Sequence, residues 1–244
     1  MSRTASSPGD LELLDTETRV LWDVDARGRL PGPEALVIAV APDGVGATVA
    51  ATVPDDLAAR LLDLTAYATP SHPGRPPAVL EPCRALLEQA APGDWTLSAG
   101  PSYLVRPPLR FDVSVAVLRS DRPADAGRVR AIRPGNWEPD EWEELLDGGH
   151  GAPWTMIADG DRVASICHTP RRTRAGAEAG TWTDPAFRGR GYAAATTAAW
   201  ADLLSADCPH LFYSTSADNL SSQRVAGRLG LRAIGWLWKL TRKS

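Results

Sequence analysis

The strongest constraint on this chain is a glycine loop, Arg-Gly-Arg-Gly-Tyr-Ala at residues 188–193, which joins a predicted strand to a predicted helix. The strand is the short β-branched and aromatic run at 181–183, and the helix is the alanine-rich stretch after the loop. Glycine lets the backbone turn sharply and approach a ligand closely, and free N–H groups at a helix N-terminus point at an anion. Arg188 and Arg190 add positive charge. The loop therefore predicts a site for a phosphate-bearing cofactor.

Two nucleotide-binding motifs are similar to this loop but do not fit it. A Walker loop ends in Gly-Lys-Ser/Thr, whereas Gly191 is followed by Tyr192 and Ala193. The spacing Gly189-x-Gly191-x-x-Ala194 fits the dinucleotide fingerprint, which opens a long βαβ domain. Only about fifty residues follow the loop, too few for such a domain. Both nucleotide sites are excluded by these features.

A third pattern fits better. Arg188, Gly191 and Ala193 follow a strand in the spacing Arg-x-x-Gly-x-Ala. In this the loop resembles the acetyl-CoA loop of the GNAT superfamily of acyl-CoA N-acyltransferases.

The neighbouring segments extend the resemblance. A predicted strand at 210–216 is followed by Asn219 and a helix, and Gly230 comes eleven residues after Asn219, which looks like the family's second cofactor segment. Upstream, residues 154–168 alternate around an Asp-Gly pair, which is typical of a hairpin. The resemblance covers about residues 129–240, roughly half of the chain.

The resemblance implies a mixed α/β fold, with a GNAT-like mixed sheet flanked by helices in the C-terminal half. It also implies acetyl-CoA as co-substrate and direct acetyl transfer to a primary amine of a small molecule or peptide. The main chain of Trp182 and Thr183 would hold the pantetheine arm, with a nearby N–H facing the developing oxyanion. Carried over residue by residue, the cofactor-binding set is Trp182, Thr183, Arg188, Gly189, Arg190, Gly191, Tyr192, Ala193, Asn219 and Ser222.

Two residues are candidates for the base. An acceptor ammonium with a pKa of about 10 must lose a proton before it can attack. Glu178 opens the strand before the loop and shares a face with Gly180 and Trp182, because side chains alternate along a strand. His168 ends the preceding strand, and its usual pKa of about 6.5 suits a base. The alternatives are that Glu178 is a solvated edge residue or an ion-pair partner of nearby arginines, and that His168 is structural.

The general acid is not evident. Many GNAT proteins carry a Tyr seven residues after the Asn, proposed to protonate the leaving thiolate, and this chain has Ala226 there. A thiol of pKa about 8.5 can leave as thiolate, so turnover is still expected. Ser221 and Ser222 are the nearest hydroxyls, and we expect Ser222 to contact the cofactor. The alternatives are a non-catalytic acyl-CoA-binding or interaction module, and an O-acyl or longer-chain acyltransferase.

Composition narrows the class of protein. The three cysteines, Cys83, Cys167 and Cys208, form no C-x-x-C motif, so neither a disulfide framework nor a metal site is expected. The formal net charge of −4 argues against a nucleic-acid partner. The N-terminus is unlike a signal peptide and no apolar run approaches membrane length, which predicts a cytoplasmic protein without a membrane partner. We expect a monomer or homodimer.

The chain is expected to contain a tail at 1–9, an N-terminal α/β domain at 10–122 and the GNAT-like domain at 123–244. The N-terminal domain is either a degenerate GNAT-like domain or an unrelated lid that walls the acceptor site. A helix at 139–146 with Trp142 is expected to border that site. The other expected elements are a hairpin at 35–53, helices from 54 and at 82–91, a loop at 68–78, strands at 95–98, 103–106 and 111–118, and a linker at 119–128.

Overall fold

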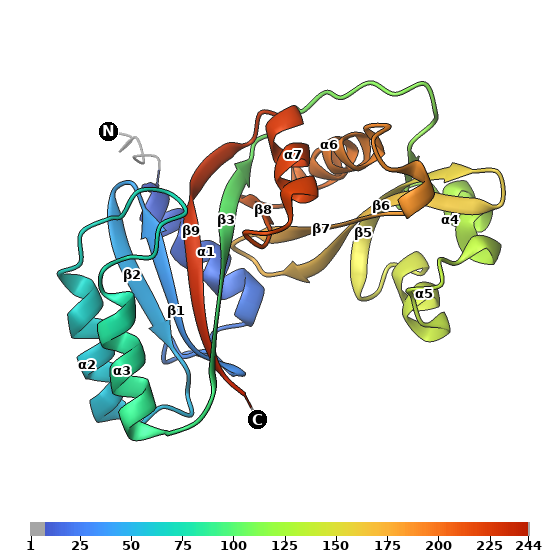
Figure 1. Ribbon diagram of the computed structural model, residues 1–244. Helices are drawn as coiled ribbons and strands as arrows, with labels where there is room; N and C mark the ends of the chain where they lie inside the picture. Colours follow the sequence, from blue (N-terminus) through green and yellow to red (C-terminus); the bar gives the residue numbers. More distant parts are fainter. Residues whose placement is uncertain (1–7, 244) are drawn as a thin grey trace, which may run out of the picture. The chain divides into compact units, whose positions relative to one another are not determined.

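The computed structural model describes residues 8–243, which contain seven α-helices and nine β-strands. The mixed α/β fold class is therefore confirmed. The chain divides into two compact units (Figure 1). Within the described residues, unit 1 comprises 8–103, 214–219 and 233–243, and unit 2 comprises 104–213 and 220–232. Most of the expected tail at 1–9 lies outside the described residues.

Unit 1 is a helix-covered sheet with the strand order β2-β1-β9-β3. β1 is antiparallel to both β2 and β9 and is buried along nearly its whole length. Helix α1 packs where Gly235 of β9 leaves room for the side chain of Leu14. The elements are α1 (Asp10–Trp22), β1 (Glu34–Ala41), β2 (Gly44–Val49), α2 (Asp55–Ala66), α3 (Leu80–Ala90), β3 (Trp95–Val105) and β9 (Arg232–Arg242).

Most predictions for this half hold. The hairpin at 35–53 is β1 and β2, and the helix from 54 is α2. Leu57 and Leu61 of α2 lie in the core, whereas Leu64 is 38% exposed, because the buried stripe turns toward Thr65 instead. The strands predicted at 95–98 and 103–106 form one strand, β3, and the sequence analysis did not predict α1.

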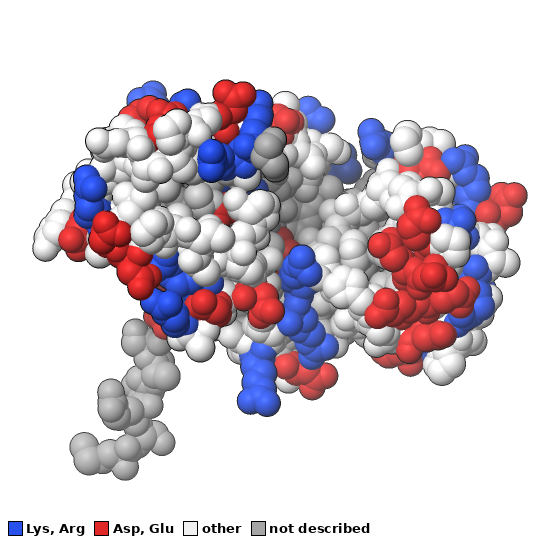
Figure 2. All heavy atoms as spheres, turned by 90° about the horizontal axis from the view of Figure 1, so that it is seen from below, with Lys and Arg blue, Asp and Glu red and all other residues white. Residues whose placement is uncertain are grey.

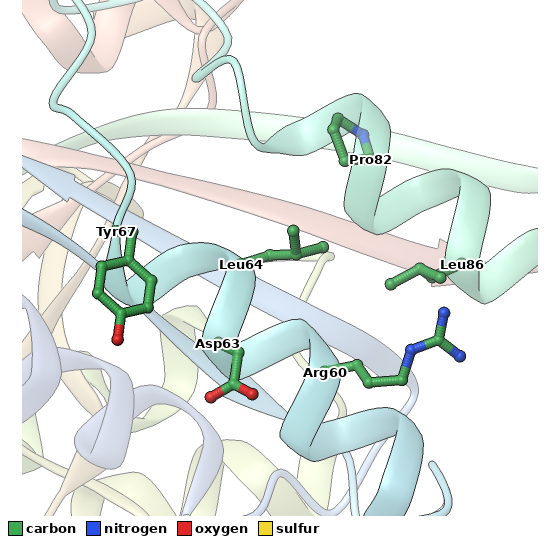
Figure 3. A pocket seen from close by; sticks show the side chains of 6 residues that line it. All are labelled: Arg60, Asp63, Leu64, Tyr67, Pro82 and Leu86. Carbon is green, nitrogen blue, oxygen red and sulfur yellow. The ribbon is translucent and has the colours of Figure 1, made fainter.

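A shallow groove lies between α2 and α3 (Figure 3). Its volume is about 710 Å³, and Leu64, Leu86 and the fully exposed Tyr67 line it together with the charged Arg60 and Asp63. No histidine, cysteine or serine of residues 8–243 lines it. We assign it no chemistry.

Unit 2 is a mixed sheet with the strand order β8-β7-β6-β5-β4. The pairs from β4 to β7 are antiparallel, and β7 runs parallel to β8. The elements are β4 (Leu118–Arg119), α4 (Pro123–Val129), the 3-10 helix η1 (Arg130–Ile132), α5 (Pro139–Leu146), β5 (Gly151–Asp159), β6 (Arg162–Arg172), β7 (Ala177–Thr183), the 3-10 helix η2 (Pro185–Phe187), α6 (Tyr192–Leu204), β8 (Leu211–Ser214) and α7 (Leu220–Arg228).

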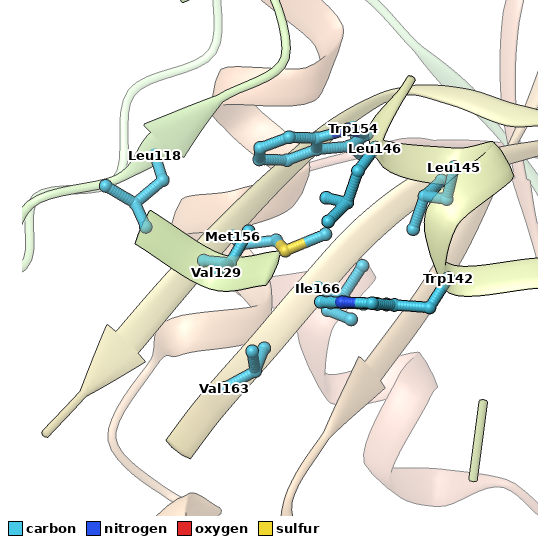
Figure 4. Packing of buried hydrophobic residues seen from close by; sticks show 9 residues of the cluster. All are labelled: Leu118, Val129, Trp142, Leu145, Leu146, Trp154, Met156, Val163 and Ile166. Atoms are coloured by element: carbon cyan, nitrogen blue, oxygen red, sulfur yellow. The ribbon is translucent and has the colours of Figure 1, made fainter. Parts of the chain in front are cut away.

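Helices cover both faces of this sheet. On one face Trp142 of α5 packs with Met156 of β5 and Ile166 of β6 in a buried cluster (Figure 4). On the other face α6 contacts β5 and β6, where Thr155 Oγ1 donates to the Thr196 carbonyl at 2.7 Å. Trp142 is only 1% exposed and packs in the core. That the helix at 139–146 borders an acceptor site stays a prediction.

Two predictions for the first part of unit 2 are wrong. The strand expected at 111–118 is present only as β4, at its end. Every second side chain of this segment is half-buried, as in a strand, but the segment pairs with no strand before Leu118. The linker expected at 119–128 contains helix α4, which Pro123 begins at the first helical position, where a missing N–H costs nothing.

Among the described residues, no helix is both long enough and apolar enough to cross a bilayer.

Candidate active site

The glycine loop presents a set of free amides. Gly189 and Gly191 have φ of +82° and +84°, a conformation that favours glycine. Gly191 is the N-cap of α6, and the first helical bond runs from the Ala195 N–H to the Gly191 carbonyl at 3.1 Å. Within the described part of the chain, the N–H groups of residues 189–194 donate to no protein acceptor. These amides at the start of a 13-residue helix fit a diphosphate.

Charge surrounds the loop. Arg188 and Arg190 are exposed. The Arg190 guanidinium lies 5.0 Å from the centre of the buried Phe187 ring, and its Nη1 is 3.7 Å from Asp159 Oδ2. Tyr192 is buried, so it can offer an anion only its main-chain N–H.

The two strands beside the loop, β7 and β8, separate after a short paired stretch. β7 and β8 pair at only two positions, Ala177 with Leu211 and Glu178 with Phe212. β7 continues to Thr183, and no further pair joins the two strands within residues 8–243. The edge of β7 that faces β8 is therefore left open to another hydrogen-bonding chain.

Only alternate residues of β7 present their main chain at this open edge. The Asp184 N–H donates to a carbonyl of β6 at 3.0 Å, and the Trp182 carbonyl accepts from Ser165 Oγ at 3.1 Å. Because neighbouring residues in a strand direct their main-chain groups to opposite edges, Thr181 and Thr183 face β8. Of the two residues expected to hold pantetheine, Thr183 has its main-chain groups at the open edge, whereas the main-chain groups of Trp182 face β6. Contact with the cofactor stays a prediction for both residues.

Both candidate bases lie on strands β6 and β7, on the face that α5 covers. His168 pairs with Gly180, and a Cβ added at Gly180 would lie 2.4 Å from the His168 ring. The Trp137 ring meets the imidazole edge-on at 5.0 Å. Burial lowers the pKa of His168 to about 4, so the ring is neutral at pH 7. His168 does not end its strand, because β6 continues to Arg172.

Glu178 lies further along β7, opposite Arg171. Only 4% of its surface is exposed, which excludes the alternative that it is a solvated edge residue. Alternation along the strand places it on the face of Gly180 and Trp182, as predicted. Trp182 itself packs against the cluster of Figure 4.

A hollow of about 310 Å³ adjoins this face, near the lower end of the usual range for ligand pockets. Trp182 and Val163 line it, together with Arg162 and Asp184, which form an ion pair at 2.5 Å, and the exposed Arg133.

One buried hydroxyl group beside the open edge of β7 was not among the predicted site residues. The Tyr213 hydroxyl lies 2.7 Å from Ser222 Oγ and 3.3 Å from Thr181 Oγ1, so it links β8 to α7 and to the open end of β7. Burial raises the pKa of Tyr213. Ala226 is buried one helical turn after Ser222, on the same side of α7. In the sequence, Tyr213 is one aromatic residue of a predicted strand, with no motif to mark it.

Asn219 is exposed, and its N–H donates to the Ser216 carbonyl at 3.1 Å. By its contacts it belongs to unit 1, whereas Ser222 belongs to unit 2. Cys167 is buried and burial raises its pKa, which makes it a poor nucleophile. In the part of the chain that the structure describes, no cluster of three or more His, Cys, Asp or Glu residues could hold a metal ion.

A family model described as the acetyltransferase (GNAT) domain matches residues 109–232, half of the chain. The chain belongs to the GNAT acetyltransferase family. This GNAT match includes the glycine loop, both parted strands and all of α7.

Solved GNAT structures are similar to the chain at low identity. A GCN5-related N-acetyltransferase from Kribbella flavida is 16% identical, with 98% of this chain and 97% of that chain covered and a TM-score of 0.49. A GCN5-related N-acetyltransferase-like protein from Streptococcus suis 89/1591 is 14% identical, with 95% and 99% covered and a TM-score of 0.46. Comparison with curated proteins gives no match. Membership of the GNAT family therefore rests on the domain match.

Proposed function

We propose that this GNAT domain transfers an acetyl group from acetyl-CoA directly to a primary amine of a small molecule or peptide. The observation that supports this most is the row of unpaired amides at 189–194, beside the open edge of β7. The amides and the two loop arginines would hold the diphosphate, and the main chain of Thr181 and Thr183 would bond the pantetheine arm. Acetyl-CoA supplies an acyl group already activated as a thioester, and the chain supplies alignment, which is worth roughly 7–11 kcal/mol of the barrier.

Glu178 is the better candidate for the base. An amine attacks only when neutral, so a proton must pass to the protein or to water. A histidine with a pKa of about 4 is too weak to take that proton efficiently, which leaves His168 as a neutral hydrogen-bonding group. Glu178 is buried on the same face, where it can act directly or through one water.

Acidic side chains support a cationic acceptor. Figure 2 shows them gathered on the face seen from below, and α5 with its flanking residues carries Glu138, Asp140, Glu141, Glu143, Glu144 and Asp147, all exposed. Arg130 neutralises part of this charge through Glu143 and Asp147. The remaining field attracts a cation to the side of the sheet that holds Glu178.

The test of this function is binding followed by turnover. Acetyl-CoA at about 100 times its Kd should stabilise the protein by about 2.7 kcal/mol in a thermal unfolding experiment. Acetyl-pantetheine, which lacks the diphosphate, is the matched control and should stabilise it far less. If the two compounds stabilise the protein equally, or if neither does, the glycine loop does not bind the diphosphate. Release of free thiol when a panel of amines is added then identifies the acceptor.

One observation favours a non-catalytic acyl-CoA-binding module as the second candidate. Ala226 offers no hydroxyl where many relatives carry a tyrosine. Tight binding of acetyl-CoA without amine-dependent thiol release would support that candidate.

The substitution Glu178→Gln keeps the volume of the side chain but removes the base. We expect the acetylation rate at pH 7 to fall by a factor of about 10² or more and to lose its rise with pH. Binding of acetyl-CoA, measured by calorimetry, should stay near the wild-type value. A wild-type pH profile would take Glu178 out of the mechanism.

A further inference from the structure

The segment from Arg106 to Val117 is a strap without regular structure (the long green loop after β3 in Figure 1). Its side chains alternate, with odd-numbered residues half-buried and even-numbered ones exposed from 110 onward. No main-chain hydrogen bond joins the strap to any part of the chain that the structure describes. Apolar side chains alone therefore hold it in place.

The apolar side chains of the strap pack against α6, the helix that follows the glycine loop. Leu109 and Phe111 pack against Ala194 and Ala198 of α6, near α7. Val113, Val115 and Val117 pack with Phe111 on a second cluster, made of Ile157, Ala164, Phe187, Tyr192 and Ala195. Phe111 is the one strap residue that belongs to both groups, so it lies over the first turn of α6.

Phe111 also contacts the glycine loop itself. A Cβ built on Gly191 would lie 2.7 Å from the Phe111 ring, so the ring occupies the space beside that glycine. Phe187 lies under Arg190 and packs in the same cluster as Phe111. The loop is thus bounded by two phenylalanine rings, one from its own chain segment and one from the strap.

From this geometry we infer that Phe111 is a positioning residue, which holds the loop and the start of α6 in the conformation that binds an anion. The N–H groups of this loop have no protein partner, so hydrogen bonds from them do not help to order it, and its order depends more on the side chains that surround it. Phe111 restricts the loop before any ligand arrives. The entropic cost of ordering the loop therefore does not reduce the free energy of ligand binding. The inference rests on the proposed function only where it names coenzyme A as the anion.

The test compares Phe111→Ala with Val115→Ala, a control from the same strap whose side chain packs only in the second cluster and is not among the atoms nearest to Gly191. Without ligand, hydrogen exchange of the amides at 195–198 should be at least tenfold faster in Phe111→Ala and unchanged in Val115→Ala, since the Ala195 N–H is bonded to the Gly191 carbonyl. The Kd for coenzyme A should rise about tenfold in Phe111→Ala only, with little change in kcat. Phe111→Leu should recover most of both losses.

Phe111→Val gives the same comparison if the alanine variant does not fold. The inference would be overturned if the Phe111 variants and Val115→Ala had equal exchange rates at 195–198 and equal Kd values for coenzyme A. If the wild-type protein does not bind coenzyme A but the exchange rates of Phe111→Ala and Val115→Ala still differ, the proposed function is wrong. The positioning role of Phe111 is then still supported.

Discussion

At the scale of single residues, environment separates side chains that look alike in the sequence. Glu178 and His168 are both candidates for the base in the sequence. Burial removes His168 as a base by lowering its pKa, whereas Glu178 stands on the same face in a buried position. Tyr213 gave no signal in the sequence but joins three elements through its hydroxyl.

His168 should make the protein sensitive to mild acid. The folded protein protonates this ring only below a pH of about 4, whereas the unfolded chain does so below about 6.5. Between these values the unfolded state binds more protons, so stability falls as the pH falls. From pH 7 to pH 5 the wild-type free energy of unfolding should drop by on the order of 1–2 kcal/mol more than that of His168→Gln. Urea unfolding at both pH values measures this, and equal drops would contradict it.

Tyr213→Phe tests whether this hydroxyl protonates the leaving thiolate in place of the residue absent at 226. Because burial raises its pKa, Tyr213 stays protonated at neutral pH and can donate. We expect kcat to fall by about tenfold or more, with the Kd for acetyl-CoA nearly unchanged. Ser222→Ala, which removes only the 2.7 Å partner, should have a smaller effect. A kcat equal to wild type would assign Tyr213 a purely structural role.

At the scale of elements, the strand–loop–helix unit is the part that constrains substitution most. Gly191 is required twice, by its positive φ and by the ring of Phe111. Gly191→Ala should therefore destabilise the protein by about 1–2 kcal/mol from backbone strain alone, and further through the clash.

The clash can be separated from the strain. In a Phe111→Ala background the ring is gone, so Gly191→Ala should cost less there than in the wild type. Denaturant unfolding of the four proteins of this cycle measures the difference. Additive costs would mean that the two residues do not interact.

Elements with their own local signal could be predicted from the sequence. The glycine loop, the α5 helix with its capping box and the hairpin at 154–168 are set by neighbours in the chain, and the structure has all three. The strap could not be predicted, because alternating valines suit a strand equally well and only tertiary packing decides whether the backbone pairs. The assignment of Asn219 and Ser222 to different units could not be predicted either, because only two residues separate them in the chain.

At the scale of the whole molecule, the order of elements along the chain and the order of strands in space do not agree. β9 lies between β1 and β3, although about 130 residues separate it from the end of β3. The expected boundary at 122/123 assigned this strand to the C-terminal domain, whereas by its contacts nearly all of it belongs to unit 1.

A fragment of residues 10–122 should consequently fail to fold by itself. It would leave the inner edges of β1 and β3 without a partner and expose the apolar residues that β9 covers. We expect no cooperative thermal transition by circular dichroism. The matched control joins residues 232–243 to the fragment through a flexible glycine-serine linker and should regain the transition. A cooperative transition in the bare fragment would contradict this account of unit 1.

The position of β9 also has a consequence during synthesis. A ribosome delivers β1 and β3 first, and β9, the strand between them, emerges only about 190 residues after β1 and about 130 residues after β3. During that interval β1 has an edge that could pair with another nascent chain. The cell must therefore protect an unfinished sheet while the acetyltransferase core is still being translated.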